Sequence, residues 1–105
     1  SPLVELVERL IGKGYDVRIF DVNVRMASLI GANKEFILNR IPHLARLLVP
    51  TLNEIFSHAD TVILGNGEVK EDEFAPLVRD GQHIVDLVRV TDKRRISGEY
   101  EGICW

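Results

Sequence analysis

Short apolar runs alternate in this chain with segments whose apolar residues recur at helical spacing, and this alternation restricts the fold most. Residues 61–64 (TVIL) contain no charged or amide side chain, as expected for a strand covered on both faces. A second buried strand is expected at 84–88, and further strands at 17–20, 47–49 and 99–105. Strands separated by helices predict an α/β domain with a mostly parallel sheet of 4-5 strands.

Helices are expected between the strands, because each intervening segment begins with a helix-start signal and continues with apolar residues at helical spacing. Ser1 and Pro2 suit the cap and first turn of the first helix, and Gly14 is expected as its left-handed C-cap. Thr51 and Glu54 form a capping box for a later helix. The other helices are expected at 23–31, 33–41 and 72–79, with Asn23 and Asn33 as caps. Right-handed crossovers would then place helices on both faces of the sheet, giving a Rossmann-like three-layer sandwich.

Length and charge exclude several classes of protein. The 105 residues correspond to a single domain, residues 1–105. Thirteen basic and sixteen acidic residues give a net charge of −3, which argues against nucleic-acid binding. The chain has no apolar stretch near the roughly 18 residues of a membrane span, and its single cysteine cannot form an internal disulfide. We expect a cytoplasmic protein that binds neither nucleic acid nor membrane.

The residue pattern predicts no catalytic group and no metal site within the chain. Residues 12–14 (GKG) lie between a helix and a strand, whereas a dinucleotide fingerprint joins a strand to a helix N-terminus. Cys104 is interpreted as a small buried hydrophobic residue. His43, His58 and His83 lack the spacing of metal ligands. The acidic run 68–73 is interpreted as the polar start of a helix.

Ligands of parallel α/β sheets bind at the carboxyl ends of the strands. Three segments meet that description: residues 21–23, 65–67 and 86–89. Asp21 is interpreted as a turn or helix-capping carboxylate, because the partner residues of a phosphoacceptor site are missing. Asn66 and Gly67 are candidates for ligand contact by their position alone.

Segments spread over nearly the whole chain resemble one known family. They are residues 1–8 (SPLVELVE), 12–21 (GKGYDVRIFD), 31–35 (GANKE), 41–43 (IPH), 60–67 (DTVILGNG), 85–88 (VDLV) and 101–105 (EGICW). These segments resemble the C-terminal domain of the UDP-glucose/GDP-mannose dehydrogenase family. The GANKE and EGICW segments are the most specific, and they favour the GDP-mannose branch over the UDP-glucose branch.

The resemblance implies a fragment of a longer enzyme that oxidises the C6 alcohol of a sugar nucleotide, here GDP-mannose in alginate biosynthesis. An N-terminal domain would bind the cofactor NAD, and the catalytic cysteine would also lie upstream of this chain. The family implies a homodimer or a higher homo-oligomer. Two alternatives stay open: the same domain of a UDP-sugar 6-dehydrogenase, and a non-catalytic Rossmann-like interaction or assembly domain.

The resemblance also suggests residues near the substrate. Ser1 and Pro2 match the end of the family motif Asp-x-Arg-x-Ser-Pro and are expected near the cleft between domains. Many UDP-sugar members carry an arginine two residues after the aspartate that Asp86 matches, but Val88 stands there and Arg89 follows it. In a regular strand Arg89 would point to the opposite face. The candidate substrate-binding residues are Ser1, Pro2, Asn66, Gly67 and Arg89.

Overall fold

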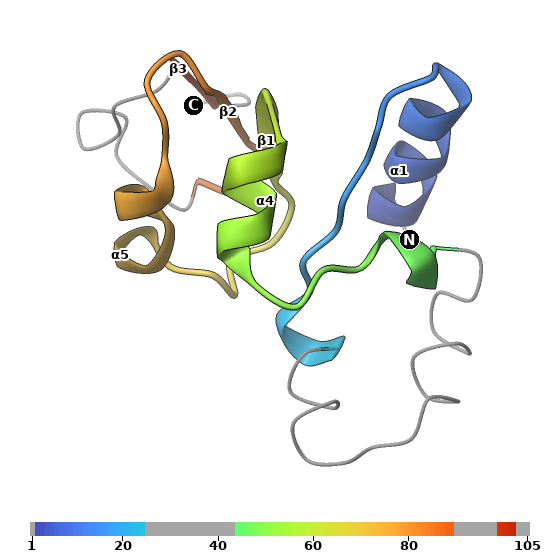
Figure 1. The fold of residues 1–105 in the computed structure, drawn as a ribbon, viewed down its shortest axis with the longest axis horizontal. Helices are drawn as coiled ribbons and strands as arrows, with labels where there is room; N and C mark the ends of the chain where they lie inside the picture. The colour runs from blue at the N-terminus through green and yellow to red at the C-terminus, as the bar shows by residue number, and fades with distance from the viewer. Residues whose placement is uncertain (1, 25–43, 90–98, 103–105) are drawn as a thin grey trace.

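The computed structural model describes residues 2–24, 44–89 and 99–102 (Figure 1). Its elements are α1 (Pro2–Gly12), the 3-10 helix η1 (Ala45–Leu47), α4 (Leu52–His58), β1 (Thr61–Leu64), α5 (Glu71–Phe74), the 3-10 helix η2 (Ala75–Leu77), β2 (His83–Asp86) and β3 (Glu99–Gly102). The helix expected at 33–41, most of the one expected at 23–31, and residues 103–105 of the last expected strand lie outside the described residues. None of the described helices has the length and apolar character needed to cross a membrane.

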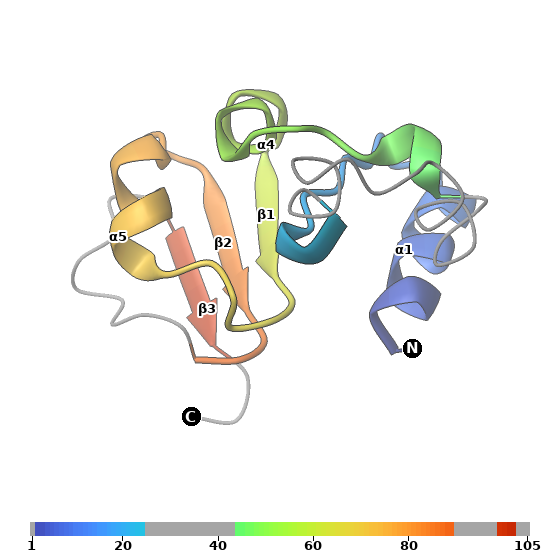
Figure 2. The same ribbon diagram turned by 90° about the horizontal axis from the view of Figure 1, so that it is seen from below.

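Strands β1, β2 and β3 form a parallel sheet in that order. Thr61 pairs with His83, and His83 pairs with Glu99. Because the three strands point the same way, their carboxyl ends lie at one edge of the sheet, which we call the carboxyl edge (Figure 2). The α/β class and the parallel sheet are as the sequence predicts.

Helices α4 and α5 cover one face of this sheet and enclose the core. Phe56 of α4 stacks on Phe74 of α5, with 5.9 Å between ring centroids and 4° between ring planes. Val62 of β1 and Ile84 of β2 complete the buried cluster. The apolar faces of the two helices therefore pack against the strand side chains that point to this face of the sheet, which are alternate residues along each strand.

The other face of β1 is more open than predicted. Ile63 points away from the core and is 37% exposed, whereas Val62 is 5% exposed. The alternation of exposed and buried residues along β1 is that of a strand with one covered face. Among the described residues, β1 is therefore covered on one face, and the helices expected at 23–31 and 33–41 fall largely or wholly outside these residues.

A separate contact joins two other segments that were expected to be strands. Ile19 and Leu48 form an isolated parallel bridge. The Ile19 N–H donates to the Leu47 carbonyl at 2.9 Å, and the Val49 N–H donates to the Ile19 carbonyl at 2.8 Å. Leu47 itself belongs to η1, so the segment has little extended length left before Pro50. The described residues thus contain a three-stranded sheet and one bridge, not a sheet of four or five strands.

Two helix boundaries follow the sequence signals. Gly14 has a φ of +92°, its N–H donates to the Ile11 carbonyl at 2.9 Å, and the Tyr15 N–H donates to the Leu10 carbonyl at 3.2 Å. This is a Schellman motif, which confirms Gly14 as the C-cap of α1. At α4, the Thr51 hydroxyl accepts from the Glu54 N–H at 3.3 Å, which confirms Thr51 as the N-cap.

Two other boundaries differ from the expectation. The helix expected at 72–79 begins at Glu71 and ends as α5 at Phe74, because Pro76 cannot continue an α-helix and the chain tightens into η2. Strand β2 ends at Asp86 instead of residue 88. The Asp86 carboxylate accepts from the Val88 N–H at 3.0 Å, which turns the chain away from the strand direction.

Candidate functional site

The loop after β1 holds two of the candidate residues at the carboxyl edge. The Asn66 Oδ1 accepts from the Glu68 N–H at 3.1 Å, so an Asx turn fixes the shape of the loop. The Lys70 Nζ donates to the Gly67 carbonyl at 2.7 Å. Asn66 and Gly67 are exposed, and a Cβ placed at Gly67 would meet no atom within 4 Å. A ligand can therefore approach the backbone of this loop closely.

The end of β2 lies beside that loop and carries a third candidate residue. The Leu87 N–H donates to the Leu64 carbonyl at 3.0 Å, which holds the ends of β1 and β2 together. Asp86 is fully buried. Arg89 is exposed and has a φ of +57°, in the left-handed region that residues other than glycine seldom occupy. Because β2 ends at Asp86, the alternation of a regular strand does not extend to Arg89 and does not fix the face to which its side chain points.

Residues 21–23 reach the same edge from the segment that contains Ile19. The Asp21 Oδ1 accepts from the N–H groups of Asn23 at 2.8 Å and Val24 at 3.1 Å. Asp21 therefore caps the helical turn at 22–24, and Asn23 lies within that turn instead of at its cap. The Asn23 side chain instead extends sideways, and its Nδ2 donates to the Glu68 Oε1 at 3.3 Å.

This Asn23–Glu68 contact is not predicted from the sequence. There, Asn23 is expected as a helix cap and as part of the segment 21–23 after a strand, and Glu68 is expected as part of a polar helix start. The two residues are 45 positions apart, and neither carries a local motif that points to the other. Their position directly after two expected strands was the only signal available.

The first turn of α1 also lies against the loop after β1. A Cβ placed at Gly65 would be 2.9 Å from the Leu3 Cδ2 atom. Pro2 is exposed at the start of α1, and Figure 2 shows this end of α1 on the same side as the ends of the strands. Ser1 lies outside the described residues. The structure thus gathers Pro2, Asn66, Gly67 and Arg89 at the carboxyl edge.

A groove of about 960 Å³ separates α1 and residues 15–21 from β1 and α4. Apolar side chains of both walls line it, including Leu6, Val17 and Ile55. Beside the start of β1, the His58 Nε2 and the Asp16 carbonyl are 2.9 Å apart. Beside the end of β1, the Asn23–Glu68 hydrogen bond crosses between the two walls. The groove therefore runs along the outer edge of β1 and reaches the carboxyl edge.

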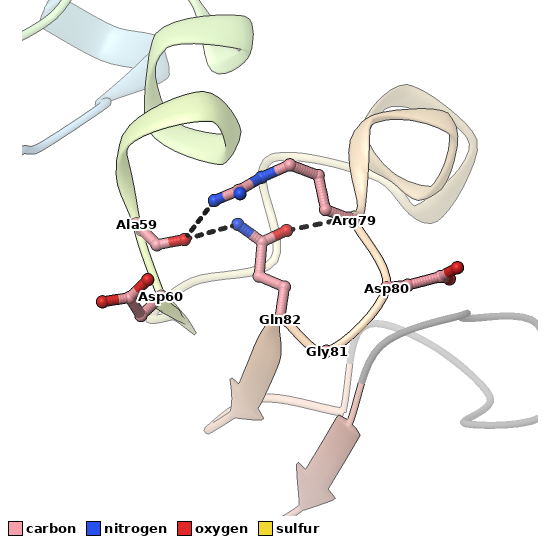
Figure 3. Close-up of a pocket in the computed structure, with 6 residues that line it drawn as sticks. All are labelled: Ala59, Asp60, Arg79, Asp80, Gly81 and Gln82. Carbon is pink, nitrogen blue, oxygen red and sulfur yellow. Dashed lines mark hydrogen bonds between the residues drawn. The ribbon is translucent and has the colours of Figure 1, made fainter.

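A smaller hollow of about 140 Å³ lies at the opposite edge of the sheet (Figure 3). The Gln82 Nε2 donates to the carbonyls of Phe56 at 2.9 Å and Ala59 at 2.7 Å. Arg79 donates to the same two carbonyls, with both distances 2.8 Å, and its own N–H donates to the Gln82 Oε1 at 3.1 Å. These bonds satisfy the free carbonyls at the end of α4. The hollow is a structural joint between α4 and β2, away from the carboxyl edge.

Replacing Gln82 with leucine should destabilise the chain by about 2 kcal/mol. The substitution keeps the volume of a side chain that is 3% exposed, but it removes two donors and an acceptor from a buried network. The unfolding midpoint in urea, followed by circular dichroism, measures the loss. Asp80→Asn is the matched control, because Asp80 is an exposed residue of the same turn. Equal midpoints for the two variants would contradict the structural role of Gln82.

The described residues provide no cluster of metal ligands. No three His, Cys, Asp or Glu side chains among them lie close enough together to hold a metal ion. Residues 12–14 form the C-cap of α1, so they do not present helix N–H groups to a pyrophosphate. Residues 12–14 therefore do not form a pyrophosphate-binding loop of the dinucleotide type. Cys104 lies outside them.

The comparisons with known proteins agree on one enzyme. No family model matches the chain. GDP-mannose 6-dehydrogenase of Pseudomonas aeruginosa is 47% identical over 105 residues, and that of Azotobacter vinelandii is 43% identical over 105 residues. Both alignments cover the whole chain. The chain belongs to the UDP-glucose/GDP-mannose dehydrogenase family.

Within this family, the chain matches the C-terminal region of GDP-mannose 6-dehydrogenases, as the GANKE and EGICW segments predicted. It spans about a quarter of the length of these relatives, 24% in both cases above. The crystal structure of a ternary complex of GDP-mannose dehydrogenase from Pseudomonas aeruginosa is similar, with a TM-score of 0.76 and 46% sequence identity. That alignment covers the whole chain and 24% of the solved chain.

Proposed function

We propose that this chain is the C-terminal nucleotide-sugar-binding domain of an NAD-dependent GDP-mannose 6-dehydrogenase, an oxidoreductase that forms GDP-mannuronate for alginate biosynthesis. The observation that carries the proposal is the 43–47% identity to GDP-mannose 6-dehydrogenases along the entire chain. The relatives reported above are GDP-mannose enzymes, and Val88 stands where many UDP-sugar members carry an arginine. Both observations speak against a UDP-sugar enzyme, and the similarity to these enzymes along the entire chain also speaks against a non-catalytic assembly domain.

In this proposal residues 1–105 are one domain that binds substrate, and the chemistry belongs to other parts of the enzyme. The resemblance to the family assigns NAD and the catalytic cysteine to other parts of the enzyme, and residues 12–14, which cap α1, agree with this assignment for NAD. Holding the nucleotide end of GDP-mannose places the distant C6 alcohol against the reacting groups, so that remote binding energy lowers the barrier. The enzyme is a cytoplasmic homodimer or higher homo-oligomer.

The proposed contacts with the substrate lie along the carboxyl edge. Asn66 and Gly67 offer an amide side chain and an open stretch of backbone. Arg89 supplies positive charge for the diphosphate at the end of β2. Pro2 approaches the same edge at the start of α1, whose Leu3 lies against the loop after β1. Ser1 is included in the proposal because it matches the family motif together with Pro2.

In the intact enzyme, residues 47–49 and 17–20 would extend the sheet as two further strands beside β1. Residues 17–20 run beside the outer edge of β1 in the same direction, because the His58–Asp16 contact lies near the start of both segments and the Asn23–Glu68 contact lies beyond their ends. Pairing of these two segments would close the groove. It would give a Rossmann-like three-layer sandwich with helices on both faces and five parallel strands, in the order 47–49, 17–20, β1, β2 and β3.

The test is steady-state reduction of NAD by the full-length enzyme that contains this chain. We expect turnover of GDP-mannose at a kcat/KM at least about 100-fold above that of UDP-glucose, because groups placed to hydrogen-bond one base are left unpaired by the other. The isolated 105-residue chain should give no turnover. Turnover by the isolated chain would refute the division of labour, and a preference for UDP-glucose would move the enzyme to the other branch.

A further inference from the structure

Successive strands of this chain are added to the sheet first in one direction and then in the other, and the direction changes at the groove. Residues 47–49 lie on one side of residues 17–20, through the Ile19–Leu48 bridge. The later strands β1, β2 and β3 follow one another on the other side of the groove. The direction in which strands are added therefore changes between residues 17–20 and β1. In open α/β sheets, ligands bind at the carboxyl ends of the two strands that flank such a reversal.

Asn23 and Glu68 occupy that position. Asn23 comes shortly after residues 17–20, Glu68 comes shortly after β1, and their side chains meet at 3.3 Å. The backbone N–H of each residue is held by a neighbouring side chain, that of Asn23 by Asp21 and that of Glu68 by Asn66. Both residues are exposed. The pair is thus fixed in place and accessible to a ligand.

The Glu68 carboxylate retains most of its capacity to accept hydrogen bonds. An ionised carboxylate has about four acceptor positions, and the Asn23 amide occupies one of them on Oε1. Both oxygens can still accept from a planar partner that presents two adjacent N–H groups. Guanine has this arrangement, with N1–H beside the exocyclic N2–H₂, whereas uracil has one N3–H between two carbonyl oxygens that a carboxylate repels.

We propose that Glu68, positioned by Asn23, recognises the guanine base of the sugar nucleotide and discriminates against uracil. This inference rests on the proposed function, because it assigns the base-specific contact within the same site. The charges along the carboxyl edge agree with a ligand whose base lies at Glu68 and whose diphosphate lies at Arg89. Arg89 follows β2, one strand away from the loop that carries Glu68. The diphosphate then lies toward β2, and the base lies over the end of β1, where a carboxylate does not face the phosphates.

The test compares GDP-mannose with its inosine analogue, IDP-mannose, in the full-length enzyme. Hypoxanthine lacks only the exocyclic amino group of guanine, so the ratio of the two kcat/KM values reports one contact. We expect the wild type to prefer GDP-mannose about tenfold, the lower end of the range for a hydrogen bond to a charged group. In Glu68→Gln the ratio should fall to within about twofold of unity, because one of the two acceptor oxygens becomes a donor.

Glu68→Gln is the sharpest substitution because its remaining oxygen can still accept from the Asn23 amide, which keeps the loop in place. Asp80→Asn is the control, since Asp80 is an exposed carboxylate at the opposite edge of the sheet; it should leave the ratio unchanged.

Asn23→Ala should raise the KM for GDP-mannose and lower the ratio of the two kcat/KM values only in part. A wild-type ratio near one, or a tenfold ratio that persists in Glu68→Gln, would overturn this inference. Failure of the wild type to oxidise GDP-mannose would instead refute the proposed function.

Discussion

Replacing Phe74 with alanine should cost the chain about 4 kcal/mol of folding free energy. Truncating a buried phenylalanine removes its transfer free energy and leaves a cavity, which together cost about 3–5 kcal/mol. Phe74 is fully buried, and it also loses its stacking on Phe56. Since a domain of this size is stable by only about 5–15 kcal/mol, the variant should be close to unfolding at room temperature.

Urea denaturation followed by circular dichroism measures the effect, with Tyr15→Ala as the matched control. Tyr15 is also a large aromatic residue, but it is 63% exposed, so its truncation should change the stability by less than about 0.5 kcal/mol. A Phe74→Ala midpoint equal to that of Tyr15→Ala would mean that the helices α4 and α5 are not held to the sheet by this cluster.

The features that the sequence predicted well are those encoded by neighbouring residues. Apolar spacing predicted that Phe74 faces inward, and the Gly14 and Thr51 signals predicted where α1 ends and α4 begins. Each of these depends on backbone groups within five residues, so local patterns contain the necessary information. The parallel direction of the sheet also followed, because short strands with helices between them have few other arrangements.

The features that sequence reasoning missed are of two kinds. Some depend on contacts between residues far apart in the sequence, and others depend on which of two suitable neighbouring residues takes a role such as helix cap. Asp21 and Asn23 are both good capping residues, and only the geometry of the turn decides for Asp21. The hydrogen bond between Asn23 and Glu68 joins two loops that approach each other through the packing around the groove. The left-handed backbone of Arg89 comes directly after the turn in which the Asp86 carboxylate accepts from the Val88 N–H, and no pattern in residues 84–89 indicates it.

Replacing Arg89 with alanine in the full-length enzyme should raise the KM for GDP-mannose about 10- to 100-fold and leave the KM for NAD unchanged. A hydrogen bond between an arginine and a phosphate is charge-assisted, and its loss costs about 1.5–3 kcal/mol, where each 1.4 kcal/mol is about a factor of ten. NAD binding belongs to another part of the enzyme in the proposed function. Steady-state kinetics with each substrate varied in turn give both values.

Two further variants separate the charge of Arg89 from its backbone conformation. Arg89→Gly removes the same guanidinium but suits the φ of +57° without strain, so its KM for GDP-mannose should match that of Arg89→Ala. Arg89→Lys retains the charge without the bidentate geometry and should recover part of the affinity. If Arg89→Gly has the KM of the wild type while Arg89→Ala does not, the residue acts through its backbone. If the KM values of all three variants equal that of the wild type, Arg89 does not contact the substrate and the diphosphate lies elsewhere along the carboxyl edge.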